Sequence, residues 1–368
     1  MALETMYFEI FITFATAFIS SYFAVPLVNI VGQKYSLVDR PNSRKQHDKP
    51  LVRIGGLAIL LGIFIPIIIT SCIGWLDINS HFQLITIIGS AFLLFSLGFL
   101  DDIFTISFSK RLFFQVLVSI IAFSQGIRFT KIDLIFLNPQ FEILELPMIL
   151  SILLTIFWIV GIVNAFNWLD GLDGLASGIA VIASLSLFLA SFSLGYNENI
   201  LFILILLGAC QGFLNHNFYP AKIFMGDGGS YLIGGFLSLY SIYIYNSSLE
   251  SINNSISFFS ILLILFIPLV DMVYVICNRI LKGKLPFYPD RGHLHHRLLR
   301  AGFNHKDSVY LCYLLSLTSG VIALCDIYPK YSIIFILISF ILNLYFLKIH
   351  FKKFKYIFEK IYSTFFNL

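Results

Sequence analysis

Apolar runs of about 20 residues follow one another along almost the whole chain. A helix needs roughly 20 apolar residues to cross a bilayer, because no water is present there to satisfy backbone polar groups. Hydrophobic residues make up 58% of the 368 residues and charged residues only 12%. The pattern predicts an all-α polytopic membrane protein with about eleven transmembrane helices. Their centres are expected near Phe18, Ile63, Ala91, Ser119, Ile156, Ser184, Ile205, Gly235, Phe266, Leu317 and Phe340.

Basic residues are concentrated on one side of the expected membrane. If the spans alternate in direction, 21 of the 24 Lys and Arg fall in segments 32–53, 101–111, 216–228, 279–308 and 348–368. The positive-inside rule makes this side cytoplasmic, with the N-terminus outside and the C-terminus inside. The same asymmetry accounts for the net charge of +4 without a nucleic acid partner. We expect a single integral membrane domain over residues 1–347 and a basic amphipathic tail on membrane lipid over residues 348–368.

Polar residues recur every three positions between Asn164 and Ala176. An unbroken helix turns by about 60° at each such step, which would leave Asn164 and Asp173 on opposite sides. A break at one of the glycines would let all four polar side chains converge, and we interpret the stretch as the floor of a catalytic site. The four residues are Asn164, Asn167, Asp170 and Asp173, and the glycines are Gly171 and Gly174.

Carboxylates mark the cytoplasmic ends of two further runs. Asp101 and Asp102 end the third run, with Arg111 after them, and Asp227 stands between glycines at the start of the eighth. An acid within a span costs about 2.5 to 3.5 kcal/mol on insertion scales, so these positions favour a functional role over a merely solvated helix end. Asp227 suits a hard cation shared with phosphate oxygens, although a helix cap, which Ser230 could also supply, is the alternative.

A basic segment and a deeper acid add to the polar pattern. Arg53 followed by Gly55 and Gly56 could cradle phosphate or form an ordinary positive-inside loop with a flexible helix start. No Walker-type glycine-rich sequence is present. Asp271, inside the ninth run, is interpreted as a partner in an ion pair or internal hydrogen bond.

A histidine segment lies in the last long cytoplasmic stretch. Its histidines raise the question of zinc, but no Cys or acid stands at zinc-finger spacing and the neighbouring residues are cationic. Anion binding therefore suits the segment better than metal binding. Its members are Arg291, His293, His295, His296 and Arg297.

These motifs together resemble the polyprenyl-phosphate N-acetylhexosamine-1-phosphate transferases over roughly residues 30–305. The resemblance implies that Asp101, Asp102, Asn167 and Asp170 are catalytic and that Asp227 binds Mg²⁺, with Mn²⁺ as an alternative ion. It implies that Leu172, Asp173, Asn217 and Phe224 surround the uridine. Phosphate and sugar contacts would come from Arg53, Arg111, Arg291, His293, His295, His296 and Arg297.

Two departures separate the chain from the muramoyl-pentapeptide branch of this family. That branch has a lysine soon after the paired acids, where this chain has Thr105 and carries its basic residue later, at Arg111. Its three histidines are consecutive, whereas Leu294 interrupts them here and Arg297 follows. Both features, and the run from Arg44 to Gly56, resemble the GlcNAc-1-phosphate branch.

The resemblance implies an enzyme of the bacterial cytoplasmic membrane with its site facing the cytoplasm. A phosphate of undecaprenyl phosphate would attack the sugar-proximal phosphorus of a UDP-N-acetylhexosamine and release UMP. A homodimer is left open. One alternative is phospho-N-acetylmuramoyl-pentapeptide transfer. A cation-coupled transporter is the alternative from another class, although transporters place polar sites near the membrane midplane and show repeats.

Overall fold

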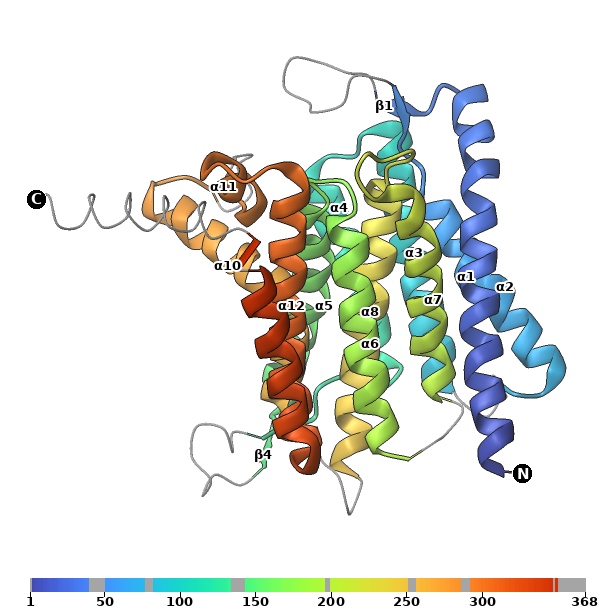
Figure 1. Ribbon diagram of the computed structural model, residues 1–368, viewed down its shortest axis with the longest axis vertical. Helices are drawn as coiled ribbons and strands as arrows, with labels where there is room; N and C mark the ends of the chain where they lie inside the picture. Colours follow the sequence, from blue (N-terminus) through green and yellow to red (C-terminus); the bar gives the residue numbers. More distant parts are fainter. Residues whose placement is uncertain are drawn as a thin grey trace, which may run out of the picture.

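The computed structural model describes residues 2–39, 50–76, 82–133, 143–195, 199–250, 256–285, 292–346 and 348–349. Helices in these ranges form a bundle (Figure 1). They are α1 (Ala2–Lys34), α2 (Gly56–Ile73), α3 (Phe82–Phe104), α4 (Phe108–Ser124), α5 (Met148–Leu169), α6 (Leu175–Ser193), α7 (Asn199–Asn217), α8 (Gly226–Leu249), α9 (Phe258–Ile264), α10 (Phe266–Leu281), α11 (Leu294–Arg300) and α12 (His305–Ile327), followed by a further helical span, Pro329–Phe346.

Within the described residues, eight helices are long and apolar enough to cross a membrane, and nine spans result if α9 and α10 are taken as one. The structure is therefore that of a helical, polytopic membrane protein. Every expected span centre lies within a helix, including Ser119 in the 17-residue α4 and Gly235 in α8. The count of eleven and the direction of insertion stay predictions.

Helix α8 runs through the middle of the bundle and is almost wholly buried, packing mainly against α3 and α5. Its small residues explain this position. A Cβ on Gly234 would lie 2.8 Å from the Val163 Cα on α5, so glycine permits close contact between the two backbones. Polar side chains also pair here, since the Trp158 indole donates to the Ser241 hydroxyl at 3.0 Å.

The expected span near Phe266 is not one straight helix. Helices α9 and α10 meet at Leu265 with a bend of 81°. The first turn of α9 is fixed by two side chains, because Phe258 N donates to Asp133 Oδ1 at 2.7 Å and Ser260 N donates to the Ser257 hydroxyl at 3.0 Å. Beyond the bend, α10 leads toward α11 at the side of the bundle (Figure 1).

Two short antiparallel hairpins accompany the helices, one near each end of the bundle. Strand β1 (Val38–Asp39) pairs with β2 (Leu51–Val52), and β3 (Lys131–Ile132) pairs with β4 (Leu144–Glu145). Strand β1 and helix α11 lie at the end opposite the N-terminus (Figure 1). The predicted motifs gather at the β1 end. The expected tail over residues 348–368 lies almost entirely outside the described residues.

Candidate active site

Backbone hydrogen bonds join the segment before α2 to the segment before α8. Phe224 N donates to the Val52 carbonyl at 2.8 Å, Gly55 N donates to the Phe224 carbonyl at 2.9 Å, and Gly56 N donates to the Met225 carbonyl at 2.8 Å. The glycine pair therefore uses its N–H groups within the protein, so it does not form the phosphate cradle considered above. Its role is close packing, because a Cβ on Gly56 would lie 2.3 Å from Gly229 N.

Asp102 caps helix α8 from the end of α3. Its Oδ1 accepts from Asp227 N and its Oδ2 accepts from Gly228 N, both at 3.0 Å, so it satisfies two N–H groups of the first turn. Arg53 holds the same residue, with Nε 3.7 Å from Oδ1 and a second bond to the Asp102 carbonyl. Ser230, considered above as a cap, instead donates to the Asp227 carbonyl at 3.2 Å.

Asp227 is held on both sides by other polar groups. Its Oδ1 accepts from the Asn167 amide at 2.7 Å, and its Oδ2 lies 3.4 Å from Arg111 Nη1. The same Arg111 nitrogen lies 2.5 Å from Asp101 Oδ2. Asp101 is therefore an anchor for Arg111, while the Asp227 side chain stays 33% exposed.

The predicted break after α5 is present. The helix ends at Leu169, and Gly174 adopts a left-handed φ of +78° just before α6, a conformation that favours glycine. Because α5 stays helical through Asn167, however, Asn164 lies about one turn earlier on the helix and about 60° around it. It donates to Gln115 Oε1 on α4 at 2.7 Å instead of joining the other three. The expectation that all four polar side chains converge is therefore wrong for Asn164.

Asn217, the last residue of α7, binds the segment between α5 and α6 and the first turn of α6. Its Oδ1 accepts from Gly174 N at 3.1 Å and from the Ser177 hydroxyl at 2.8 Å, and its Nδ2 donates to the Ile223 carbonyl at 2.9 Å. Asp173 accepts from Ala221 N at 2.9 Å on the same side. These bonds fix the geometry of the loop that carries Asp170.

The histidine segment packs against the other side of the break. Asp271 Oδ2 lies 2.8 Å from His293 Nδ1, and Oδ1 accepts from Leu294 N at 2.6 Å, so the internal hydrogen bond expected of Asp271 is present. His295 is 1% exposed. Burial, followed by the charge of His296, lowers the pKa of His295 to about 3, so this imidazole is neutral at physiological pH.

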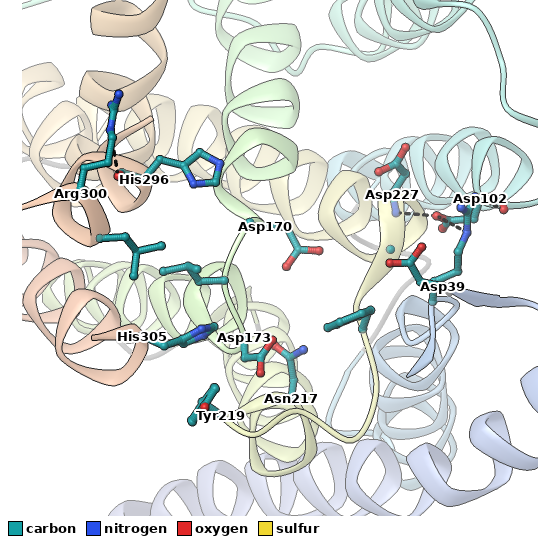
Figure 2. Close-up of a pocket in the computed structure, with 16 residues that line it drawn as sticks. Asp39, Asp102, Asp170, Asp173, Asn217, Tyr219, Asp227, His296, Arg300 and His305 are labelled. Atoms are coloured by element: carbon teal, nitrogen blue, oxygen red, sulfur yellow. Dashed lines mark hydrogen bonds and ion pairs between the residues drawn. The ribbon is translucent and has the colours of Figure 1, made fainter. Parts of the chain in front are cut away.

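A cavity of about 570 Å³ opens where these elements meet, a size typical of ligand pockets. In Figure 2 the Asp170 carboxylate points into it, between His296 and Asp227. Burial, then the charges of Asp102 and Asp173, raises the pKa of Asp170 to about 7. The lining consists of Asp39, Arg53, Asp102, Asp170, Gly171, Leu172, Asp173, Asn217, Tyr219, Phe224, Gly226, Asp227, His296, Leu299, Arg300 and His305.

Several predicted residues stand behind this lining rather than in it. They are Asp101, Arg111, Asn167, His293, His295 and Arg297. The Arg297 guanidinium stacks 4.3 Å from the Tyr274 ring centroid, and Arg291 lies outside the described residues.

Sequence reasoning missed other lining residues, namely Asp39, Tyr219, Leu299, Arg300 and His305. A signal existed for two of them, since Leu299 and Arg300 follow His296 at the three- and four-residue spacing of one helix face. For Asp39 we find no sequence signal, because its place at the cavity depends on the pairing of β1 with β2.

Comparison with known proteins places this sequence in a family. Residues 84–245 match the family model described as glycosyl transferase family 4. The chain is 35% identical to a probable undecaprenyl-phosphate N-acetylglucosaminyl 1-phosphate transferase of Bacillus subtilis, over 92% of each chain. It is 31% identical to a decaprenyl-phosphate N-acetylglucosaminephosphotransferase of Mycobacterium tuberculosis, over 81% of this chain and 78% of the relative.

A third relative is the undecaprenyl-phosphate alpha-N-acetylglucosaminyl 1-phosphate transferase of Escherichia coli, 29% identical over 82% of this chain and 79% of the relative. All three names belong to the GlcNAc-1-phosphate branch that the spacing of the histidines resembles. With similarity over nearly its whole length and the family's motifs gathered around one cavity, the chain belongs to glycosyl transferase family 4, among the polyprenyl-phosphate N-acetylhexosamine-1-phosphate transferases.

Proposed function

We propose that this protein transfers GlcNAc-1-phosphate from UDP-GlcNAc to undecaprenyl phosphate and releases UMP. The cavity carries the proposal, because it sets the acids Asp102, Asp170 and Asp227 against basic groups at one end of an apolar bundle. A charged nucleotide sugar can enter such a site from water while a lipid phosphate reaches it from the bilayer. The activities in the names of the three relatives support the same reaction.

In the proposed reaction an oxygen of the lipid phosphate forms a bond to the sugar-proximal phosphorus. The bond from that phosphorus to the UMP oxygen breaks, UMP leaves with the electron pair, and the bond between sugar carbon and oxygen stays intact. A phosphate monoester has its second pKa at about 6 and is largely a dianion at neutral pH. Positioning and charge neutralisation are therefore the main tasks of the protein.

Residue roles follow from position in the cavity. Arg53, His296 and Arg300 supply its basic wall and would bind phosphate oxygens. Among the described residues the Asp170 carboxylate has no hydrogen-bond partner, and its raised pKa suits a group that orients or accepts a proton. Phe224 and Leu172 line the same cavity and would contact the uridine.

Asp227 is the residue we propose as the Mg²⁺ ligand, with Mn²⁺ as the alternative ion. No three His, Cys, Asp or Glu side chains of the described ranges are grouped closely enough to hold a metal by themselves. A partly exposed carboxylate backed by Asn167 nevertheless fits Mg²⁺, which takes only one or two protein carboxylates beside water and substrate phosphates. The ion would neutralise charge on the diphosphate.

The donor is tested with purified protein, undecaprenyl phosphate and a panel of UDP-sugars, by measuring UMP. UDP-GlcNAc or a closely related UDP-N-acetylhexosamine should be used, because the histidine segment resembles that branch. UDP-MurNAc-pentapeptide should give no UMP above the level without acceptor. Turnover of the pentapeptide donor at a comparable rate would contradict the proposal.

We further propose that eleven spans place the cavity at the cytoplasmic face of the bacterial cytoplasmic membrane. In a variant without native cysteines, single cysteines at the exposed positions Ser109 and Lys282 should react with a membrane-impermeant maleimide only after the cells are opened. Cysteines at Gln125 and Glu145, which are exposed at the other end, should react on intact cells. The reverse labelling pattern would exclude this orientation.

A further inference from the structure

The ring of His295 lies directly against the backbone of Gly171, the residue after Asp170. A Cβ added at Gly171 would lie 2.3 Å from His295 Nε2, 2.8 Å from Cε1 and 3.2 Å from Cδ2. Even an alanine would therefore collide with the whole edge of the imidazole. Glycine is required here by the close approach of the ring.

A chain of buried contacts fixes the position of that ring. His295 stacks almost parallel to His293, with ring centroids 5.7 Å apart and planes at 9°. His293 is in turn held by Asp271, which also accepts from Leu294 N and so fixes the start of α11. His293, His295 and Asp271 are all at least nine-tenths buried.

The same cluster also contacts the C-terminal end of α5, just before the Asp170 loop. Trp168, two residues before Asp170, packs edge-on against His293 at 5.7 Å, and the Arg279 guanidinium lies 5.0 Å from the Trp168 ring centroid. The loop that carries Asp170 is thus held by His293 through Trp168 and by His295 through Gly171. The hydrogen bonds from Gly174 and Ser177 to Asn217 hold the other end of this loop, where α6 begins.

We propose that Asp271, His293 and His295 are positioning residues that hold the Asp170 loop, and that His296 is the histidine of this segment that meets the ligand. This inference rests on the proposed function and refines it. His296 lines the cavity, whereas His293 and His295 stand behind it. Asp271 is thereby joined to the active site without touching substrate.

The proposal predicts a loss of kcat rather than of donor binding. Misplacement of a reacting group by about 1 Å can cost 10²-fold in rate. A residue that contacts the donor equally in the ground and transition states would instead raise KM at constant kcat. Measuring both constants separates the two roles.

A double-mutant cycle tests the contact between the loop and His295. Gly171→Ala should lower kcat at least about tenfold, because its methyl group displaces the loop or the ring. Adding His295→Ala removes the ring and makes space for that methyl group, so the double variant should be at least about threefold faster than Gly171→Ala alone. Gly161→Ala is the matched control on α5, since its Cβ would meet only Met272 Cε at 3.5 Å, and it should retain normal kinetics.

Asp271 is tested with two substitutions of similar size. Asp271→Asn can still accept from Leu294 N and donate to His293 Nδ1, so it should keep most of the wild-type kcat. Asp271→Leu loses both bonds and should fall at least about tenfold, as Gly171→Ala does. Equal losses in the Asn and Leu variants would show that the carboxylate charge itself is needed, and would overturn the positioning role.

The cycle can also be measured without substrate, by the thermal unfolding midpoint of the full-length protein in detergent. Gly171→Ala should lower the midpoint, and His295→Ala should restore part of it. The unfolding measurement tests the contact even if the wild type releases no UMP from UDP-GlcNAc. Failure of the proposed function can therefore be distinguished from failure of this inference. A double variant that shows only the sum of the single effects in both assays would overturn the inference, as would a raised donor KM at normal kcat in His295→Ala.

Discussion

Replacing Asp227 with Asn is expected to slow UMP release by at least about 10²- to 10³-fold, the usual cost of losing one preorganised electrostatic contact. The amide keeps the size of the side chain and removes its charge. Asn167 and Arg111 both donate to the carboxylate, and an amide can accept from only one of them, so the substitution removes the charge together with one of these two contacts. If Asp227 binds Mg²⁺, the Mg²⁺ concentration that gives half-maximal rate should also rise.

Asp326→Asn is the matched control for this substitution. Asp326 also accepts hydrogen bonds, from Ser257 and Ser260, but it lies at the opposite end of α12 from His305, which lines the cavity. Its Mg²⁺ titration and rate should stay close to those of the wild type. A normal Mg²⁺ titration in Asp227→Asn together with a shifted one in Asp101→Asn or Asp170→Asn would assign the metal to the latter acids.

Replacing Asp170 with Asn is expected to reduce kcat by at least about 10²-fold while leaving the protein as stable as the wild type or more stable. Among the described residues the carboxylate has no hydrogen-bond partner, and it lies partly buried near the charges of Asp102 and Asp173. Ionised Asp170 is therefore an unfavourable charge in the cavity, a stability cost that is typical of a functional group.

The sign of the pH dependence follows from the raised pKa of Asp170. The unfolded chain loses this proton near pH 4 and the folded protein near pH 7. Between these values the folded state binds more protons, so the contribution of Asp170 to stability falls as pH rises. Thermal midpoints measured at pH 5 and pH 8 should show a larger advantage of Asp170→Asn at pH 8. A lower midpoint than wild type at pH 8, with normal kcat, would exclude this role.

The sequence determined the class of the protein because hydrocarbon imposes a simple rule. Each apolar run must become a helix to satisfy its own backbone, so the run centres could be placed without any tertiary information. The motif residues could be singled out for a related reason. Acids such as Asp102 and Asp170 are costly near a membrane and stand out against an apolar background.

The division of roles among those residues was decided only by tertiary contacts. Asp102 and Asp227 are 125 residues apart, and nothing local in either segment indicates that one caps the helix of the other. The three-residue repeat predicted that Asn164 would join Asn167 at the site. In the structure α5 stays helical between them, and Asn164 donates a hydrogen bond to Gln115 on α4. The histidine segment likewise looked like one anion site.

Folding divides that segment because α11 has a buried face and an exposed face. His295 faces Gly171 and is buried, whereas His296, one residue later on the helix, turns by about 100° and faces the cavity. Sequence chemistry thus singled out polar residues that the structure gathers in and around one cavity. The direction in which each side chain leaves its helix, and the packing between distant segments, decided which of these residues line the cavity and which lie behind it.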